Sequence, residues 1–354
     1  MKKIITYLLL FLLLAVIVAF ITAQVVSAPA TLLKLAPAVW PNASPQAPEI
    51  ATTTIIFGGD VMLSRNVNQQ SAKYGDWAWP LKKIASTTAA ADLFVINLES
   101  PFTIGGNHLV KTGSFSFNAD PRSLEALTLS GVDVVSLANN HTTNQGKKGI
   151  SDTQKLLAEN NIAYGGAGLN EAEARLPVIR EINGVKFGFL AYAYPDDYSL
   201  AGASNFGLAG MDIDKMTTDV SRLKQQTDII IIIMHAGYEY TTVPNRQQKN
   251  FAQTAIDAGA DLVVGHHPHW AQTTEVYKGK PILYSLGNLV FDQMWSKETG
   301  EGALAKVLVT DKKITSVEII PIIIKDYGQA EIADDQAKTS ILKQMALPSG
   351  KILF

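Results

Sequence analysis

Cysteine is absent from the 354 residues of this chain. Its absence excludes disulfide bonds, thiolate-bound metals and a thiol nucleophile. An excess of charge of either sign is also lacking, because 30 lysines and arginines face 32 aspartates and glutamates. The overall charge therefore gives no reason to expect binding to an anionic bilayer surface, and we expect no nucleic-acid partner. Any metal ion would have to be held by histidine, carboxylate and amide oxygen.

The chain begins with a long apolar run. Residues 4–26 carry no charged side chain and follow Lys2 and Lys3. Roughly 20 helical residues cross a hydrocarbon core of ~30 Å, whereas a cleaved signal peptide has an apolar region of about 7–15 residues. We therefore interpret residues 1–27 as an uncleaved transmembrane signal anchor in the lipid bilayer, with cleavage near Ser27 as the alternative. The two lysines predict a single-pass protein of the cell membrane whose globular part is extracytoplasmic.

Residues 28–51 are rich in proline, alanine, serine and threonine, which predicts an extended linker. From residue 52, short runs of isoleucine, valine and leucine alternate with segments of helical spacing. Such runs are typical of strands buried on both faces, and the alternation predicts an α/β domain over 52–326, with a C-terminal tail over 327–354. The predicted strands are Thr53–Phe57, Leu93–Leu98, Val132–Leu137, Lys186–Tyr192, Asp228–Met234, Asp261–Val264 and Pro281–Leu286, with a closing pair over 302–324; the predicted helices are Asp120–Ser130, Gly149–Asn160, Asp212–Gln225 and Asn245–Gly259.

Polar residues follow the ends of these predicted strands, where open α/β sheets place their binding sites. Five of the six histidines fall at only three strand ends. A lone histidine beside an apolar strand is usually structural, but five gathered in this way predict a metal site. The residues of the predicted site are Asp60, Glu99, Asn140, His141, His235, His266, His267 and His269.

The types of side chain indicate the metal. Neutral imidazole, carboxylate and amide oxygen together suit Zn²⁺, Mn²⁺ or Fe better than Ca²⁺ or Mg²⁺. His267 and His269 are two residues apart, so in an extended chain they point to the same side and could bind neighbouring ions. A carboxylate can bridge two such ions about 3.5–4 Å apart. The sequence thus predicts a divalent cofactor of one or two ions.

Six ordered motifs resemble a known family, the CapA-type capsule synthesis proteins of the calcineurin-like metallophosphatase superfamily, which are associated with poly-γ-glutamate. The likeness covers about residues 53–324 and implies a layered α/β/β/α sandwich of the metallophosphatase type. The motifs are GGDVMLSR, INLESPF, SLANNHTTNQG, MHAGYEY, GADLVVGHHPHWAQ and PILYSLGNLVFDQ.

The resemblance also implies roles for individual residues. His141 would protonate the leaving group, and Glu99 stands where the superfamily keeps a bridging aspartate. His266 is an additional residue, for which support of the ligands is expected. The metal ligands implied by the resemblance are Asp60, Glu99, Asn140, His235, His267 and His269.

Two positions depart from the pattern. Met62 stands where the superfamily usually has a histidine, so one metal loses a ligand and a single-metal site is an alternative. Asn144 stands where CapA-like sequences commonly carry aspartate, which leaves the role of that position open.

Three further residues are candidates for substrate binding. Arg65 could offer its planar fork to a carboxylate or phosphate group, and Lys111 could meet an anionic ligand. Glu239 could contact substrate, bind metal or hold His235. For each of these residues an ordinary surface role is the alternative. Asn288 and Asp292 are predicted to hold the last loop by local hydrogen bonds.

These expectations leave three functions open. The first is a metal-dependent, phosphoesterase-like hydrolase or transferase in the synthesis or export of capsule or poly-γ-glutamate, acting on the anionic polymer or on a phosphoester. The second is a non-catalytic accessory subunit that holds the anionic polymer beside a membrane-bound synthase. The third is a secreted phosphoesterase unrelated to polymer. Fold membership alone does not choose between them.

Overall fold

The computed structural model of the protein describes residues 51–354 except 106–107, 109–112 and 195–198. The predicted signal anchor, nearly all of the predicted linker and Lys111 lie outside the described residues. Within the described part, no helix is both long and apolar enough to cross a membrane.

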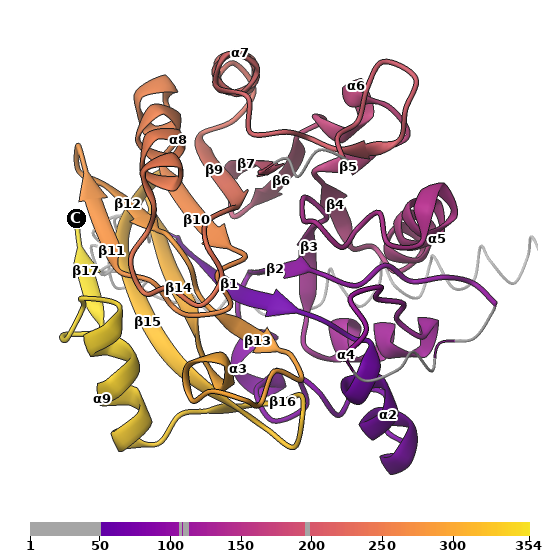
Figure 1. The fold of residues 1–354 in the computed structure, drawn as a ribbon. Helices are drawn as coiled ribbons and strands as arrows, with labels where there is room; N and C mark the ends of the chain where they lie inside the picture. The colour runs from indigo at the N-terminus through magenta and orange to yellow at the C-terminus, as the bar shows by residue number, and fades with distance from the viewer. Residues whose placement is uncertain (1–50, 106–107, 109–112, 195–198) are drawn as a thin grey trace, which may run out of the picture. The chain divides into compact units, whose positions relative to one another are not determined.

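The larger of two main sheets is mixed (Figure 1). Its strands run in the order β16-β15-β14-β1-β2-β3-β4, with β13 beside β1 and β17 beside β15. The pairs from β1 to β4 are parallel, and β14 to β16 continue the sheet antiparallel. The strands are β1 (Thr52–Val61), β2 (Leu93–Leu98), β3 (Val132–Ser136), β4 (Ala163–Gly165), β13 (Asn288–Val290), β14 (Glu301–Thr310), β15 (Lys313–Lys325), β16 (Gln329–Ile332) and β17 (Lys351–Leu353).

The smaller main sheet runs in the order β11-β12-β10-β9-β7-β6. Its inner strands are parallel, and its two edge strands, β6 and β11, are antiparallel to their neighbours. A third sheet consists only of β5 (Ala167–Gly168) and β8 (Gly207–Leu208). The strands of the smaller main sheet are β6 (Val178–Ile182), β7 (Val185–Ala193), β9 (Ile229–His235), β10 (Leu262–His266), β11 (Thr274–Tyr277) and β12 (Lys280–Leu283).

Helices cover the outer faces of both main sheets. The helices α7 and α8 pack on the smaller sheet, while α4 and α5 contact β3 and β4, and α9 contacts β14 and β15. A capping box at Asn245 starts α8, since its side chain and that of Gln248 satisfy each other's backbone N–H groups. The helices are α2 (Arg65–Tyr74), α3 (Ala85–Thr88), α4 (Leu124–Leu129), α5 (Gly146–Glu159), α6 (Glu171–Ala174), α7 (Ile213–Leu223), α8 (Arg246–Ala258) and α9 (Asp335–Gln344), with 3₁₀ turns η1 (Pro121–Ser123) and η2 (Glu298–Gly300).

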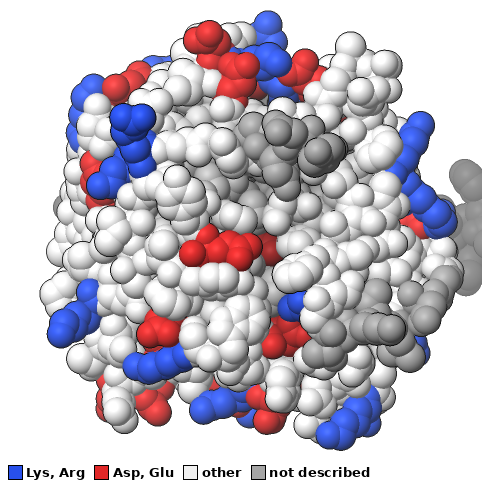
Figure 2. Space-filling model, in the orientation of Figure 1, with Lys and Arg blue, Asp and Glu red and all other residues white. Residues whose placement is uncertain are grey.

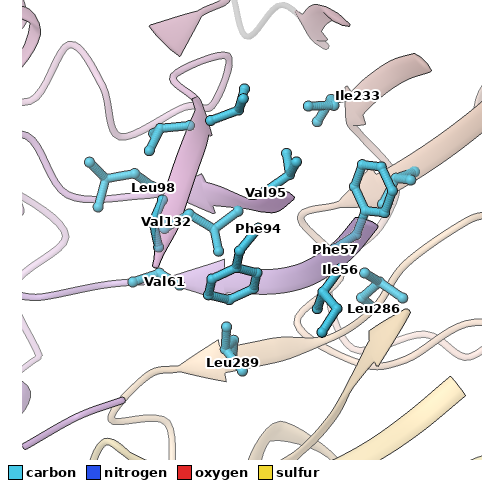
Figure 3. Close-up of a cluster of buried hydrophobic side chains, with 14 of the residues drawn as sticks. Ile56, Phe57, Val61, Phe94, Val95, Leu98, Val132, Ile233, Leu286 and Leu289 are labelled. Atoms are coloured by element: carbon cyan, nitrogen blue, oxygen red, sulfur yellow. The ribbon is translucent and has the colours of Figure 1, made fainter. Parts of the chain in front are cut away.

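The main core lies between the two sheets. Figure 3 shows Phe57 of β1, Val95 of β2 and Ile233 of β9 within one buried cluster. The isoleucines of β9 alternate: Ile231 and Ile233 belong to this cluster, whereas Ile230 and Ile232 belong to the cluster formed with α7 and α8. Both faces of β9 are therefore buried, which explains its unbroken apolar run. The mixed α/β class predicted from the sequence is confirmed.

Each predicted strand and helix corresponds to an element of the structure, with ends that differ by a few residues. Helix α2 and edge strand β6 were not predicted. The sequence of α2 has few apolar residues, and it buries Arg65, Asn68 and Ser71 on its inner side. In the C-terminal tail, residues 327–354 contribute β16 and β17, which pair with β15 in the larger sheet, and α9, which packs on it.

A close backbone approach at Gly59 fixes the end of β1. A Cβ atom built on Gly59 would lie 2.0 Å from the carbonyl oxygen of Gly287, so only glycine fits. The next residue, Asp60, donates its backbone N–H to that same oxygen at 3.0 Å. The position of the Asp60 carboxylate thus depends on this contact.

Gly59→Ala is expected to lower the free energy of unfolding by about 2–3 kcal/mol, because the added methyl group must push two strands apart. Chemical denaturation measures the change. Gly300→Ala is the matched control, since no atom lies within 4 Å of a Cβ built there, and a change of about 0.5 kcal/mol or less is expected. Equal effects of the two substitutions would contradict the tight contact at Gly59.

Candidate metal centre

Side chains from the ends of four parallel strands meet at one end of the two main sheets. Asp60 on β1 pairs in register with Asn97 on β2, and His235 on β9 pairs with His266 on β10. The carboxyl ends of parallel strands lie together, which is where open α/β sheets bind ligands. These strands are buried along most of their length, so rigid backbone holds the side chains.

Three of the predicted ligands, Asp60, Glu99 and His269, form a buried set that we call the inner group. Each offers an atom within 4.8 Å of the others. The Nδ1 of His269 lies 2.9 Å from Asn288 Oδ1. Because the amide nitrogen of Asn288 donates elsewhere, that atom is an oxygen, and His269 donates to it. The ring is thereby oriented with its Nε2 lone pair available to a metal.

Both carboxylates of the inner group are fully buried. Burial, with added repulsion from Asp60 and Glu239, raises the pKa of Glu99 well above its usual range. Burial would also raise the pKa of Asp60, but the imidazoles of His266 and His269 outweigh it and hold that pKa well below its usual range. The Oε2 atom of Glu99 is buried and accepts no hydrogen bond from the described residues. A divalent cation would satisfy this oxygen and both carboxylates, so the residues fit the metal.

The other three predicted ligands, Asn140, His235 and His267, form what we call the outer group. The Nε2 of His235 lies 3.0 Å from Asn140 Oδ1, and the rings of His235 and His267 have centroids 4.8 Å apart. These three residues and Tyr194 line a pocket of about 130 Å³. Burial lowers the pKa of His235 well below its usual range, so the imidazole is neutral, as a metal ligand must be. The six predicted ligands thus divide into two sets of three.

Asn97 joins the two groups, although the sequence analysis did not select it. Its Nδ2 lies 2.8 Å from Asp60 Oδ1, 3.2 Å from Glu99 Oε1 and 3.3 Å from His235 Nδ1. Its own Oδ1 accepts from Asn139 Nδ2 at 3.1 Å. Asn97 and Glu99 are two residues apart at the end of one strand, and this period of two was the signal that could have found Asn97.

His141 faces the outer group with a defined tautomer. Its Nδ1 lies 3.0 Å from Asn144 Oδ1, which also accepts the backbone N–H of Phe117 at 2.7 Å. That atom of Asn144 must therefore be the oxygen, and His141 donates from Nδ1. Its Nε2 then carries the lone pair, 3.4 Å from Asn140 Nδ2. Asn144, whose role was open, fixes this orientation.

The surroundings keep His141 uncharged. Its ring stacks on Phe117 with centroids 3.9 Å apart. Burial lowers the pKa of His141 to about 4, against the weaker opposing effect of the hydrogen bond to Asn144. In this state His141 accepts a proton through Nε2, and it donates one only after taking one up.

The remaining candidates lie as follows. The guanidinium of Arg65 forms a buried ion pair with Asp292, donates to Ser114 O and lies 4.8 Å from the Phe117 ring centroid. It is thus engaged within the protein beside the residue that stacks on His141. Glu239 is exposed, and its charge contributes to the raised pKa of Glu99.

Three other positions complete the site. His266 places its Nδ1 3.1 Å from Asp60 Oδ1, but without the alignment of a hydrogen bond. Met62 is fully buried in the core between the sheets, where its sulfur accepts the N–H of Ser64. Asn288 makes local hydrogen bonds as predicted, but it also orients His269, and Asp292 reaches the distant Arg65.

His269→Ala should weaken Mn²⁺ binding about 100-fold or more, because it removes a nitrogen from the inner group. Isothermal titration calorimetry on the metal-free protein measures the affinity. His108→Ala is the control, since His108 is bonded to Thr103 and contributes to neither group. Unchanged affinity in His269→Ala would show that the metal, if bound, is held elsewhere.

In the metal-free protein, His141 should be neutral at pH 5.5, with its proton on Nδ1, because its pKa is lowered to about 4. Nitrogen-15 NMR of the imidazole distinguishes the two tautomers and the protonated form. Asn144→Leu removes the acceptor and should give a mixture of tautomers. A protonated ring in wild type at pH 5.5, or a proton on Nε2, would contradict the assigned geometry.

Comparison with known proteins gives a consistent family match. The model of the family described as bacterial capsule synthesis protein PGA_cap matches residues 54–293. The capsule biosynthesis protein CapA of Bacillus anthracis is 30% identical over 308 residues, covering 84% of this chain and 74% of that protein. The PGA biosynthesis protein CapA of Bacillus subtilis is 30% identical over 296 residues, covering 83% of this chain and 77% of that protein. The solved NAD nucleotidase of Haemophilus influenzae is 14% identical, with a TM-score of 0.47 over 84% of this chain and 56% of that one.

Proposed function

Because the chain belongs to the PGA_cap family of bacterial capsule synthesis proteins, we propose that it acts in the synthesis or export of an anionic capsule polymer of the poly-γ-glutamate kind. We further propose that it does so by metal-dependent hydrolysis or transfer. The observation that carries the catalytic part is the set of two ligand groups joined by Asn97, with the neutral His141 beside them. The packing of helices on two stacked sheets supports the metallophosphatase type of fold.

The residues of the two groups define the chemistry. One or two divalent ions, for which Mn, Zn and Fe are the candidates, would be held by the inner and outer groups and would supply Lewis acidity and activation of water. The Nε2 lone pair of His141, which lies near Asn140, would accept the proton that the attacking water or hydroxyl loses and return it to the leaving group. Asn144 and Phe117 hold that ring in place. Both a phosphoester and a γ-glutamyl amide have an electrophilic atom, the phosphorus or the carbonyl carbon, that an activated water could attack.

The N-terminal apolar run supports a location at the cell membrane. We propose that residues 1–27 anchor the chain in the bilayer and that the linker of residues 28–51 holds the globular domain outside, beside a membrane-bound synthase. On the outer side of the membrane, the domain would contact the polymer as the polymer leaves the synthase.

An accessory, non-catalytic role is the second candidate. The buried Met62, in place of a histidine, favours it because one metal ligand of the superfamily pattern is missing. In this role the domain would hold the polymer beside the synthase without changing its covalent bonds.

Polymer output in a deletion strain tests the proposal. His141→Ala is expected to reduce secreted polymer at least about tenfold at equal protein level, because loss of a positioned proton carrier costs about 10²–10⁴-fold in rate. His108→Ala is the matched control and should restore output fully. Full output from His141→Ala would refute catalysis and leave the accessory role, while turnover of small phosphoesters without any effect on polymer would indicate an unrelated phosphoesterase.

A further inference from the structure

The pocket that Tyr194 and the outer group line is small. Its volume of about 130 Å³ equals the space of roughly four water molecules at about 30 Å³ each. Pockets that enclose a whole drug-sized ligand have volumes of about 300–1,000 Å³. One carboxylate, amide or phosphate group therefore fits beside His235 and His267, and the rest of a larger ligand, such as a nucleoside or a sugar ring, would lie outside the pocket.

Tyr194 also lines this pocket, and the sequence analysis did not select it. It follows the last residue of β7, and its backbone N–H donates to the carbonyl of His235 at 2.9 Å, which fixes it against β9. Its side chain is 46% exposed. A large aromatic ring that is both fixed at its backbone and open to solvent is placed to contact a ligand that extends out of the pocket.

The pocket provides no cationic side chain. The described residues that line it include neither lysine nor arginine. In the view of Figure 2, acidic atoms lie in the middle of the face, and most lysine and arginine side chains lie toward its outline. An anionic group that enters the pocket must therefore be balanced by a bound cation, so its binding requires the metal.

We propose that the pocket admits a single carboxylate- or amide-sized group of a chain-like substrate, and that Tyr194 is a specificity-determining residue that contacts the adjoining part of the chain. This inference rests on the proposed function, since it describes how the metal centre would bind the polymer. It excludes cyclic substrates that would have to enter the pocket whole.

Binding of a fluorescently labelled γ-glutamyl oligomer to the full chain, followed by anisotropy with and without Mn²⁺, tests the proposal. Tyr194→Ala is expected to weaken binding about tenfold, the effect of about 1.4 kcal/mol from a lost aromatic contact. Tyr194→Phe keeps the ring and should stay within about threefold. Tyr238→Ala is the matched control, because Tyr238 is even more exposed, at 69%, but does not line the pocket.

The outcomes separate this inference from the proposed function. Removal of Mn²⁺ with a chelator should abolish oligomer binding in every variant, and the oligomer should bind more tightly than AMP. Equal affinities of Tyr194→Ala and Tyr238→Ala, with Mn²⁺-dependent binding intact, would overturn the role of Tyr194 alone. Binding that is independent of Mn²⁺, or preference for AMP, would overturn the assignment of the pocket. Absence of both Mn²⁺ and oligomer binding in wild type would overturn the proposed function as well.

Discussion

Two carboxylates, Asp60 and Glu99, lie side by side in the interior and share the amide nitrogen of Asn97. Without a donor or cation between them, two buried carboxylates repel each other and cannot both ionise. The amide has one N–H for each carboxylate, and the same nitrogen lies 3.3 Å from His235 Nδ1, so a single neutral side chain contacts both ligand groups. The arrangement of the site depends on this contact.

The packed sheets make that contact possible. Asp60, Asn97 and His235 are at the ends of strands whose other side chains fill the core between the sheets. Gly59 allows β1 to approach Gly287, and the next residue, Asn288 at the start of β13, orients His269. Stability and site geometry are therefore linked, because a shift of β1 would move a carboxylate and a histidine together.

The sequence was sufficient for the elements with strong patterns. The apolar run of β9 and the helical spacing of α8 predicted both correctly, because burial imposes these patterns. The sequence was insufficient where contacts between residues far apart in the chain determine the structure. Nothing local distinguishes Arg65 as the partner of Asp292, 227 residues away, or Asn97 as the link between two groups. The predicted ligands do converge, yet their division into two sets required the three-dimensional arrangement.

We propose that the inner and outer groups around Asn97 hold one or two divalent ions. Anomalous diffraction from crystals soaked in Mn²⁺ tests it directly. The account predicts an anomalous peak beside Asp60, Glu99 and His269, beside Asn140, His235 and His267, or at both places. Two peaks would lie about 3.5–4 Å apart. No peak at either group, or peaks only away from these residues, would contradict it.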